Sequence, residues 1–589
     1  MTKKEKEKQP DKVNFEDLNS VFENNLKIYN QYLESFKNVG TIQNNFPSFT
    51  ANIPNTNNFT INDLSNLIAP TMTKMMESLK NFQIGVQQNP KTYFDQLNKW
   101  VSQIASLNFY FATKASGGAA NPVVLEEKTD KRFSNEEWKS NLFFDFIKQF
   151  YLISTNFLNN LIENVEFKDP KDKRLMQFYL KQLNSALSPS NFAFTNPEVL
   201  KKTVDEKGNN LAKGYENYKK DFEKHPNKLF IQQSKAGEFE IGKNLATTKG
   251  KVIFKNNLFE LIQYDCTTDQ QYAKPMLVIP PFINKYYIMD LNDKKSMMKY
   301  LVDKKLNTFL ISWKNPDASS RNISFKEYIE DGVLEALRVT CEKTGSNTAN
   351  IASYCVGGTL ASLALAYLKV VPNKYKISSA TYFASLIDFE DPGEIGIFIT
   401  EEQIASIENQ MKKTGYFDGK DMAAAFNFLR PADLYWNYVV NNYLLGNEPT
   451  AFDMLHWNSD STRLPEKMHS EYLRCMYLNN LVVKNKYKIG DVEIDLSKID
   501  TPMFAVATTE DHIAPWRSVY QGLNAYNSHI NFVLSNSGHI AGIIQGTENK
   551  PGKLHFYTKK FEKGKTQDEW FDSTKKVEGS WWPIWISWL

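Results

Sequence analysis

The chain has 589 residues, of which 42% are hydrophobic, so it is long enough to bury a large core and to form more than one domain. Its formal net charge of +3 lacks the strong basic excess that nucleic-acid binding requires. The first residues are charged and contain no signal peptide, and no stretch approaches the ~18 apolar residues of a membrane span. Four cysteines without close pairs argue against disulfides and a zinc site, so we expect a cytoplasmic protein.

Residues 1–190 are expected to form a mostly helical N-terminal domain. Apolar residues recur at helical spacing, most clearly at 143–162, and Pro-, Asn- or Gly-rich interruptions at 44–58 and 117–122 predict loose connections. Because this part contains no motif for chemistry, we interpret it as a region for assembly and for contact with a partner or a granule. Residues 191–238 are expected to be a linker.

The sequence from 239 to 589 alternates short apolar strands with helices, which predicts an α/β domain with a doubly wound, largely parallel sheet. The strands are expected at 252–254, 258–264, 276–279, 308–312, 350–354, 379–383, 502–507 and 531–534, the first two as a hairpin. Between about 386 and 496 the alternation gives way to helical, aromatic-rich sequence. An insertion at this place would form a cap whose apolar lining excludes water and favours acyl transfer over hydrolysis.

The loop after the predicted strand 276–279 contains Pro280-Pro281-Phe282-Ile283. In α/β-hydrolases this loop commonly supplies one N–H group of an oxyanion hole, and the residue after the nucleophile supplies the other. Ile283 and Val356 are therefore the candidates for these backbone donors. An ordinary tight connection is the alternative interpretation of this loop.

Cys355 follows the predicted strand 350–354 and precedes a predicted helix at 359–370. This strand–turn–helix pattern is typical of the nucleophile elbow of α/β-hydrolases, with cysteine in the place of serine. Ser353 and Gly357 are small enough for such a strained turn. The first N–H groups of the helix would face the sulfur and favour both a thiolate and an oxyanion. A buried structural cysteine is the alternative that the local sequence leaves open.

A nucleophilic cysteine needs a base and an orienting acid, which in this fold follow it in the order nucleophile, acid, base. Asp511 and His539 each lie on a polar loop directly after a predicted strand, at its carboxyl end. We therefore predict Cys355, Asp511 and His539 as the catalytic residues. His512 neighbours the acid and is expected to support the site, whereas His529 precedes its strand and should lie at the opposite end of the sheet.

The C-terminal segment 581–589 is the part of the sequence richest in tryptophan. One interpretation is a tail that docks on its own domain. The other is an apolar surface that contacts a polymer, a partner or a granule.

Residues 130–589 resemble the class I polyhydroxyalkanoate synthases, which polymerise short 3-hydroxyacyl-CoA substrates. One departure is Ser353, which stands where the family often has glycine and is compatible with the turn. The blocks that carry the resemblance are Asn244-Leu245-Ala246, 278–287, Tyr354-Cys355-Val356-Gly357-Gly358-Thr359-Leu360, 437–446, 452–465, 510–516 and Ser537-Gly538-His539-Ile540-Ala541-Gly542.

The resemblance implies an α/β-hydrolase fold with a helical cap insertion and a mechanism through covalent thioesters. His539 would take the proton of Cys355, the thiolate would attack 3-hydroxyacyl-CoA, and CoA would leave. Asp511 would act through the histidine on the 3-hydroxyl group that extends the chain. The implied substrate is 3-hydroxybutyryl-CoA, with no metal or cofactor. The implied partners are a second copy in a homodimer, the growing polyester chain and its granule, and granule-associated proteins.

Two alternatives remain at this point. A cysteine-type hydrolase or polymer depolymerase would share the catalytic residues but release free acids. A granule-coating protein with a decayed site would release no CoA at all, although the presence of Cys355, Asp511 and His539 argues against it.

Overall fold

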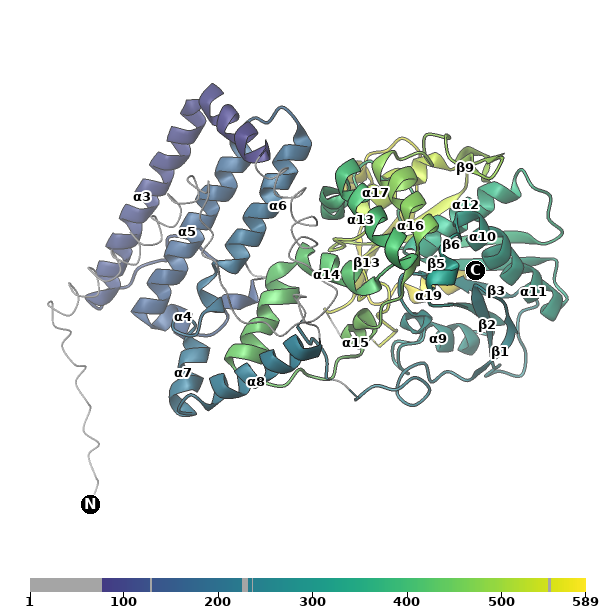
Figure 1. The fold of residues 1–589 in the computed structure, drawn as a ribbon, viewed down its shortest axis with the longest axis horizontal. Coiled ribbons are helices and arrows are strands. Elements are labelled where there is room, and N and C mark those ends of the chain that lie inside the picture. The colour runs from purple at the N-terminus through teal and green to yellow at the C-terminus, as the bar shows by residue number, and fades with distance from the viewer. Residues whose placement is uncertain (1–76, 128–129, 225–230, 236, 549–551) are drawn as a thin grey trace, which may run out of the picture. The chain divides into compact units, whose positions relative to one another are not determined.

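The computed structural model describes residues 77–127, 130–224, 231–235, 237–548 and 552–589 (Figure 1). The charged start of the chain and the Pro- and Asn-rich interruption at 44–58 lie outside these residues.

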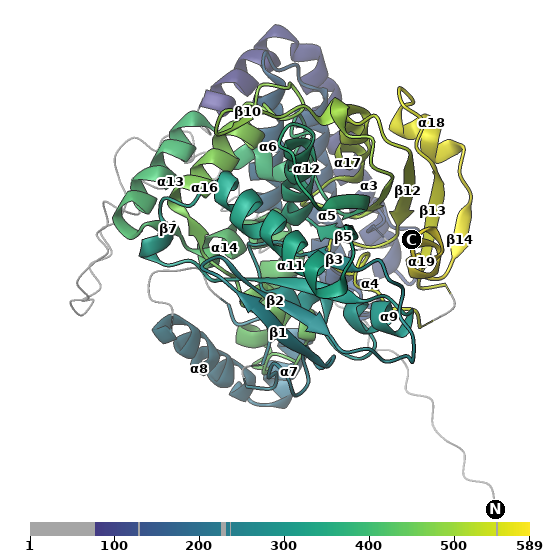
Figure 2. The same ribbon diagram turned by 90° about the vertical axis from the view of Figure 1, so that its right-hand side faces the viewer.

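A ten-stranded mixed sheet organises the chain from Gly250 onward, in the order β1-β2-β4-β3-β5-β6-β11-β12-β13-β14. The six strands from β4 to β12 are parallel, and antiparallel pairs flank them at both edges (Figure 2). This topology is that of an α/β-hydrolase and confirms the predicted fold class. The strands are β1 Gly250–Lys255, β2 Phe259–Tyr264, β3 Met276–Ile279, β4 Thr308–Trp313, β5 Thr348–Tyr354, β6 Lys376–Phe383, β11 Met503–Thr508, β12 Ile530–Ser535, β13 His555–Lys560 and β14 Lys576–Glu578.

The central strands are buried on both faces, because alternate side chains enter two separate apolar clusters. In β3, Leu277 and Ile279 belong to one cluster and Met276 and Val278 to the other, and all four are fully buried. Parallel strands covered on both faces have continuous apolar sequences. This is why the predicted parallel strands agree with the structure to within three residues at either end.

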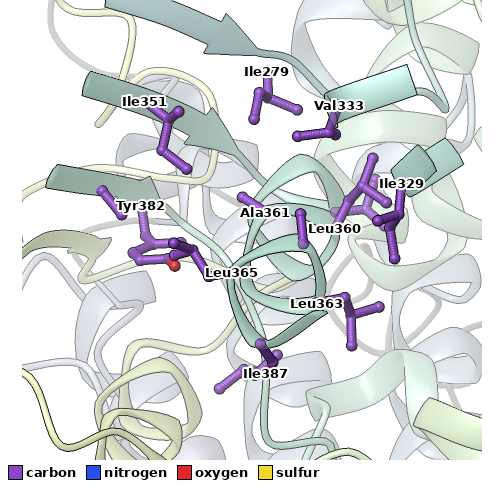
Figure 3. Packing of buried hydrophobic residues seen from close by; sticks show 14 of the residues in the cluster. Ile279, Ile329, Val333, Ile351, Leu360, Ala361, Leu363, Leu365, Tyr382 and Ile387 are labelled. Atoms are coloured by element: carbon purple, nitrogen blue, oxygen red, sulfur yellow. The ribbon is translucent and has the colours of Figure 1, made fainter. Parts of the chain in front are cut away.

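Helix α12 (Val356–Leu368) packs directly on the sheet and is buried along nearly its whole length. Figure 3 shows Leu360, Ala361 and Leu365 of this helix among residues of β3, β5 and β6. The sequence is accordingly apolar all round, as expected for a helix without a solvent face. The predicted helix at 359–370 thus begins three residues earlier.

Further helical segments cover the sheet. One of them, from 325 to 344, is a continuous helical run of three parts, with a π-helical stretch in its middle. The segments are η3 Tyr286–Met289, α9 Met297–Asp303, η4 Ala318–Ser320, α10 Phe325–Glu327, η5 Tyr328–Leu334, α11 Glu335–Thr344, α17 Trp516–Gly522, η11 Leu523–Ala525, α18 Gln567–Asp572 and α19 Trp582–Trp588.

The insertion predicted at about 386–496 lies between β6 and β11 and consists of short helices with two small antiparallel sheets. Three of its helical segments, η7, η8 and η9, are π-helical, a geometry that is often found at functional sites. Its elements are η6 Gly393–Phe398, α13 Glu401–Thr414, β7 Tyr416–Phe417, α14 Gly419–Leu429, η7 Ala432–Trp436, η8 Val439–Leu444, α15 Asp453–Ser459, β8 Leu464–Pro465, α16 Glu466–Glu471, η9 Tyr472–Leu478, β9 Lys488–Ile489, β10 Val492–Glu493 and η10 Leu496–Lys498.

The described residues before the sheet are helical. Helices α3, α5 and α6 lie side by side (Figure 1), and Asn89, Asn141 and Asp169 cap their first N–H groups. In the described residues, no helix is both long and apolar enough to cross a lipid bilayer. The elements are η1 Lys131–Phe133, α3 Pro90–Ala115, α4 Glu137–Ser140, α5 Leu142–Asn164, α6 Pro170–Ala186, η2 Pro189–Asn191, α7 Pro197–Asp205 and α8 Asn209–Lys224.

The expected linker at 191–238 contains helices α7 and α8, and α8 packs against η8 of the insertion. The Asn210 side chain donates a hydrogen bond of 2.9 Å to the carbonyl of Leu444. A Cβ atom at Gly214 would lie 1.8 Å from the carbonyl oxygen of Tyr443, so only glycine permits this approach. Much of the expected linker is therefore an ordered helical part of the fold.

Candidate active site

Cys355 occupies the one-residue turn between β5 and α12. Its backbone dihedrals, φ 54° and ψ −128°, lie in a region that residues other than glycine rarely adopt. The Cys355 N–H donates to the carbonyl of Phe383 at 2.9 Å, and the Gly358 N–H donates to the carbonyl of Cys355 at 2.9 Å. These two hydrogen bonds hold the strained conformation, which is the geometry of a nucleophile elbow.

The two glycines after the cysteine are required by close packing. A Cβ atom at Gly357 would lie 2.5 Å from the carbonyl oxygen of Ile279, and one at Gly358 would lie 2.5 Å from the Cβ atom of Ser385. Both distances are too short for real contacts. The first turn of α12, which begins with Val356, can therefore lie against the end of β3 and the segment after β6 only because these two side chains are absent.

The candidate oxyanion loop is held by Thr462 of the insertion. Its hydroxyl group donates to the carbonyl of Phe282 at 2.6 Å, and its N–H donates to the carbonyl of Ile283 at 3.1 Å. In a trans peptide the C=O and N–H bonds point in opposite directions. The Ile283 N–H shares its peptide group with the Phe282 carbonyl, so it points away from Thr462 and takes no part in this contact.

Parallel pairing brings the carboxyl ends of β5, β11 and β12 together. The edge of the sheet that these strand ends form is called the sheet edge below. Tyr354 pairs with Phe383, which in turn pairs with Val506, and Thr508 pairs with Ser535. The loops that carry Cys355, Asp511 and His539 therefore emerge at the same edge.

Asp511 and His539 form a buried hydrogen-bonded pair. Nδ1 of His539 lies 2.7 Å from Oδ2 of Asp511, and the two residues are 6% and 8% exposed. The other carboxylate oxygen accepts N–H bonds from Ile513 at 2.9 Å and Ala514 at 2.8 Å. These two bonds fix the orientation of the carboxylate. With Nδ1–H donated to Asp511, Nε2 is the nitrogen left to act as a base.

His539 also interacts with the partly buried Cys355. Burial opposes a charge on the imidazole, but the negative charges of Asp511 and Cys355, together with hydrogen bonds to both side chains, raise the pKa of His539 to about 10. The surroundings thus favour the imidazolium form of His539.

Tyr354 is a site residue that the sequence interpretation missed. Its ring stacks on the imidazole of His539 with centroids 5.3 Å apart, and its hydroxyl donates to the His539 carbonyl at 3.1 Å. Tyr354 is buried and comes directly before Cys355, so it links the nucleophile turn to the base. Its position next to the nucleophile was the only signal in the sequence.

The structure places His512 beside the proposed acid and base, and His529 away from them. Burial lowers the pKa of His512 to about 4, despite the opposing charge of Asp511, and the charge of His539 adds to the decrease. His512 is therefore neutral near pH 7. The His529 carbonyl accepts from the N–H of Met503 at the start of β11, so His529 lies at the opposite end of the strands.

Two tyrosines of the insertion, Tyr472 and Tyr477 in η9, were also missed. Burial raises the pKa of both phenols, and the charge of Cys355 contributes to the increase, so both rings lie within electrostatic range of the sulfur. Their rings meet edge to face at 5.1 Å, and Phe389 contacts both. The i→i+5 repeat of a π-helix brings these two positions to one side, a spacing that an α-helical interpretation overlooks.

Comparison with known proteins adds two family matches. Residues 129–301 match the model described as the N-terminus of poly-beta-hydroxybutyrate polymerase, and residues 274–544 match the alpha/beta hydrolase fold.

Several curated proteins are similar over most of their length. The poly(3-hydroxyalkanoate) polymerase of Methylorubrum extorquens is 41% identical over 88% of this chain and 84% of that protein. The polymerase subunit PhaC of Rhizobium etli is 36% identical over 88% of this chain and 82% of that protein, and that of Cupriavidus necator is 38% identical over 78% of each. Among solved structures, an epoxide hydrolase of Bacillus megaterium is 14% identical, covers 50% of this chain and 95% of its own, and gives a TM-score of 0.30.

Proposed function

The chain belongs to the poly(3-hydroxyalkanoate) polymerase family, and we propose that it joins (R)-3-hydroxyacyl groups from CoA thioesters into a polyester and releases CoA. The observation that carries this proposal is the pairing of Cys355 at a strained turn with the His539–Asp511 pair at the same edge of the sheet. A thiol with an adjacent base is the arrangement required for covalent acyl transfer.

In the first half-reaction, His539 takes the proton of Cys355 and the thiolate attacks the carbonyl carbon of the acyl-CoA. A new thioester bond forms to Cys355, and the bond to the CoA sulfur breaks. The N–H groups of Val356 and Ile283 would stabilise the negative oxygen of the tetrahedral intermediate. The imidazolium then gives its proton to the departing CoA thiolate.

Acylation also prepares His539 for the second half-reaction. The charge of the Cys355 thiolate is one cause of the raised imidazole pKa. Once the sulfur is acylated this charge is gone, so the pKa of His539 falls and the ring becomes a neutral base. It can then accept the proton of the 3-hydroxyl group of a second hydroxyacyl-CoA as that oxygen attacks the Cys355 thioester. The ester bond forms, the bond to the Cys355 sulfur breaks, and the released thiolate is left beside the imidazolium.

Asp511 matters most in this second step. A secondary alcohol is a much weaker acid than a thiol, so its activation depends more on a stabilised imidazolium. The buried carboxylate bonded to Nδ1 supplies that stabilisation. The proposed reaction needs no metal and no cofactor.

The insertion would decide between chain extension and hydrolysis. Tyr472, Tyr477 and Phe389 form an aromatic group close to the nucleophile. An apolar cover of this kind keeps water away from the acyl-enzyme while a hydroxyacyl group attacks it.

The polyester product accounts for the proposed location. We place the enzyme on cytoplasmic polyester granules, as a homodimer among granule-associated proteins. The exposed side chains of Phe94, Val101 and Phe109 lie along one face of α3 and give the N-terminal helices an apolar surface for such contact.

The test is to incubate the purified protein with (R)-3-hydroxybutyryl-CoA and to measure both free CoA and the product. We expect CoA release together with insoluble polyester of high mass, and neither with Cys355→Ala. CoA release with only soluble 3-hydroxybutyrate would instead identify a hydrolase, and the absence of CoA release would identify a non-catalytic protein.

A further inference from the structure

The tryptophan-rich C-terminus docks on its own domain, beside the proposed catalytic residues. Trp581, Trp582 and Trp585 are at most 1% exposed. They belong to the apolar cluster that also contains Tyr354 and contacts Cys355. The partners of their indole N–H groups indicate a more specific role than filling the core.

Two of these indoles hold the turn that follows His539. The Nε1–H of Trp581 donates to the carbonyl of Gly542 at 3.0 Å, and that of Trp582 donates to the carbonyl of Ile543 at 3.0 Å. The turn is short, because the Gly542 N–H itself bonds to the Gly538 carbonyl at 2.9 Å. A displacement of the two carbonyls would therefore be transmitted to the histidine.

The third indole, that of Trp585, is connected to the strand that carries the nucleophile. The Nε1–H of Trp585 donates to the hydroxyl of the buried Thr381 at 2.9 Å, and the carbonyl of Thr381 accepts from the Ser353 hydroxyl at 2.9 Å. Ser353 lies two residues before Cys355 in β5. The segment is thus connected to the nucleophile strand through a single threonine.

The indole rings reach the same strand end by packing. Trp581 and Trp585 contact the ring of Phe383 with centroids 5.3 and 5.1 Å apart. The carbonyl of Phe383 is the acceptor for the Cys355 N–H. One short segment therefore supports the peptide group that anchors the nucleophile and the turn that carries the base.

We propose that Trp581, Trp582 and Trp585 form a brace that sets the position of His539 relative to Cys355. They are positioning residues, because they act through the His539 turn and through β5 and β6. This inference rests on the proposed function of the Cys355–His539 pair. It assigns the C-terminal tryptophans a role in the chemistry, whereas an exposed surface for polymer or partner would leave them accessible.

The experiment uses the full-length protein with Trp581→Phe/Trp582→Phe and, separately, Trp585→Phe. Phenylalanine keeps an aromatic ring but removes the N–H donor. Trp588→Phe is the matched control, because Trp588 lies in the same helix, is only partly buried and packs on Phe504 at 5.4 Å. Circular dichroism and thermal melting establish that each variant is folded.

Two readouts separate positioning from simple stability. The first is the pH dependence of Cys355 alkylation by iodoacetamide, followed on its own peptide by mass spectrometry, which needs no acyl-CoA. The second is the kcat and KM of CoA release from 3-hydroxybutyryl-CoA.

We expect the brace variants to shift the alkylation profile to higher pH and to lower kcat by about ten- to a hundredfold with little change in KM, because small misplacements of reacting groups have effects of this size. The Trp588→Phe variant should match the wild type. A brace variant with a lower melting temperature but wild-type alkylation profile and kcat would overturn the proposal.

Thr381→Val tests the Trp585 hydrogen bond from its other end. If that bond transmits the effect, the double variant Trp585→Phe/Thr381→Val should have the same kcat as Trp585→Phe alone. If instead the two single variants each lower kcat and the double variant shows the product of both losses, the proposed connection is wrong. His539→Gln is the reference variant for the Cys355–His539 pair. A wild-type alkylation profile in His539→Gln would overturn both the proposed base and the brace. A shifted profile in His539→Gln, together with wild-type profiles in the tryptophan variants, would overturn the brace alone.

Discussion

The sheet edge and the insertion between β6 and β11 contribute to the same site but are built differently. At the sheet edge the proposed catalytic groups are held by short hydrogen bonds, such as that from the Cys355 N–H to Phe383 and the three that Asp511 makes with His539, Ile513 and Ala514. The insertion places its aromatic residues on short π-helical segments, and Tyr472 and Tyr477 are only partly buried.

This difference assigns different tasks to the two regions. Acyl transfer requires reacting groups that are fixed to within a fraction of an ångström, which a buried parallel sheet provides. A growing polyester requires a cover that accommodates substrates, and partly buried aromatic residues on irregular helices provide that. Substitutions at the sheet edge should therefore abolish chemistry, whereas substitutions in the insertion should change the product.

The largest effect is expected at the nucleophile. Cys355→Ala should reduce CoA release more than about 10⁴-fold without unfolding the protein, because no other group in the turn can form the acyl-enzyme. Cys355→Ser should also lose most activity, since an alcohol is far less ionised than a thiol near neutral pH. CoA-release assays, with circular dichroism as the control for folding, provide the measurement. Near-normal turnover in a folded Cys355→Ala variant would refute the site.

The next largest loss of activity is expected at the proposed base, His539. His539→Gln is expected to slow CoA release by about 10² to 10⁴-fold, because it removes the proton acceptor for both half-reactions. His529→Gln is the matched control, since His529 lies at the opposite end of the strands. Equal losses in the two variants would mean that the base is misassigned.

The protonation of His539 should also affect stability. Because the folded protein raises its imidazole pKa to about 10, protonated His539 stabilises the fold fully below pH 6.5, and this contribution is lost as the pH rises toward 10. Urea unfolding of the wild type and His539→Gln should therefore give free energies of unfolding whose difference shrinks between pH 7 and 10. A difference that stays constant over this range would argue against the imidazolium.

Asp511→Asn should separate the two half-reactions. The first acylation needs only a thiolate, which His539 can form without a carboxylate, so we expect a loss of about tenfold or less. Chain extension needs a stabilised imidazolium and should fall by about 10²-fold or more. The measurement is single-turnover CoA release beside steady-state polymer formation. Equal factors for the two rates would show that Asp511 serves thiol activation just as much.

The elements that could be predicted from the sequence are those in which nearly every side chain is buried. Central strands such as β3 and β5 are covered on both faces and therefore stand out as apolar runs, and the residues at their ends follow directly. This is how His539 was distinguished from His529. In contrast, β13 and the edge strand β14 are polar strands in which few side chains are buried, so no apolar run indicated them.

The missed site residues depend on contacts between distant segments. Tyr354 meets His539 across 185 positions of sequence, and Trp585 meets Thr381 across 204. Local periodicity contains no information on such pairs. Tyr472 and Tyr477 were missed for another reason, because a π-helix changes which positions share a face.

The smallest effect on rate, and the most informative one about the insertion, is expected at Tyr477. Tyr477→Leu removes an aromatic ring near the sulfur but leaves the residues at the sheet edge untouched. The CoA-release rate should fall by about tenfold or less, since a change in apolar pocket contacts has an effect of this order. The product should change more, because a looser cover admits water to the acyl-enzyme and diverts acyl groups to free 3-hydroxy acid.

Tyr416→Leu is the control, as that insertion tyrosine packs under the guanidinium of Arg463 at 4.5 Å. The measurement is the ratio of soluble acid to polyester at equal CoA release. An unchanged ratio in Tyr477→Leu, together with a large loss of rate, would place Tyr477 in the chemistry and remove the proposed division between the two regions.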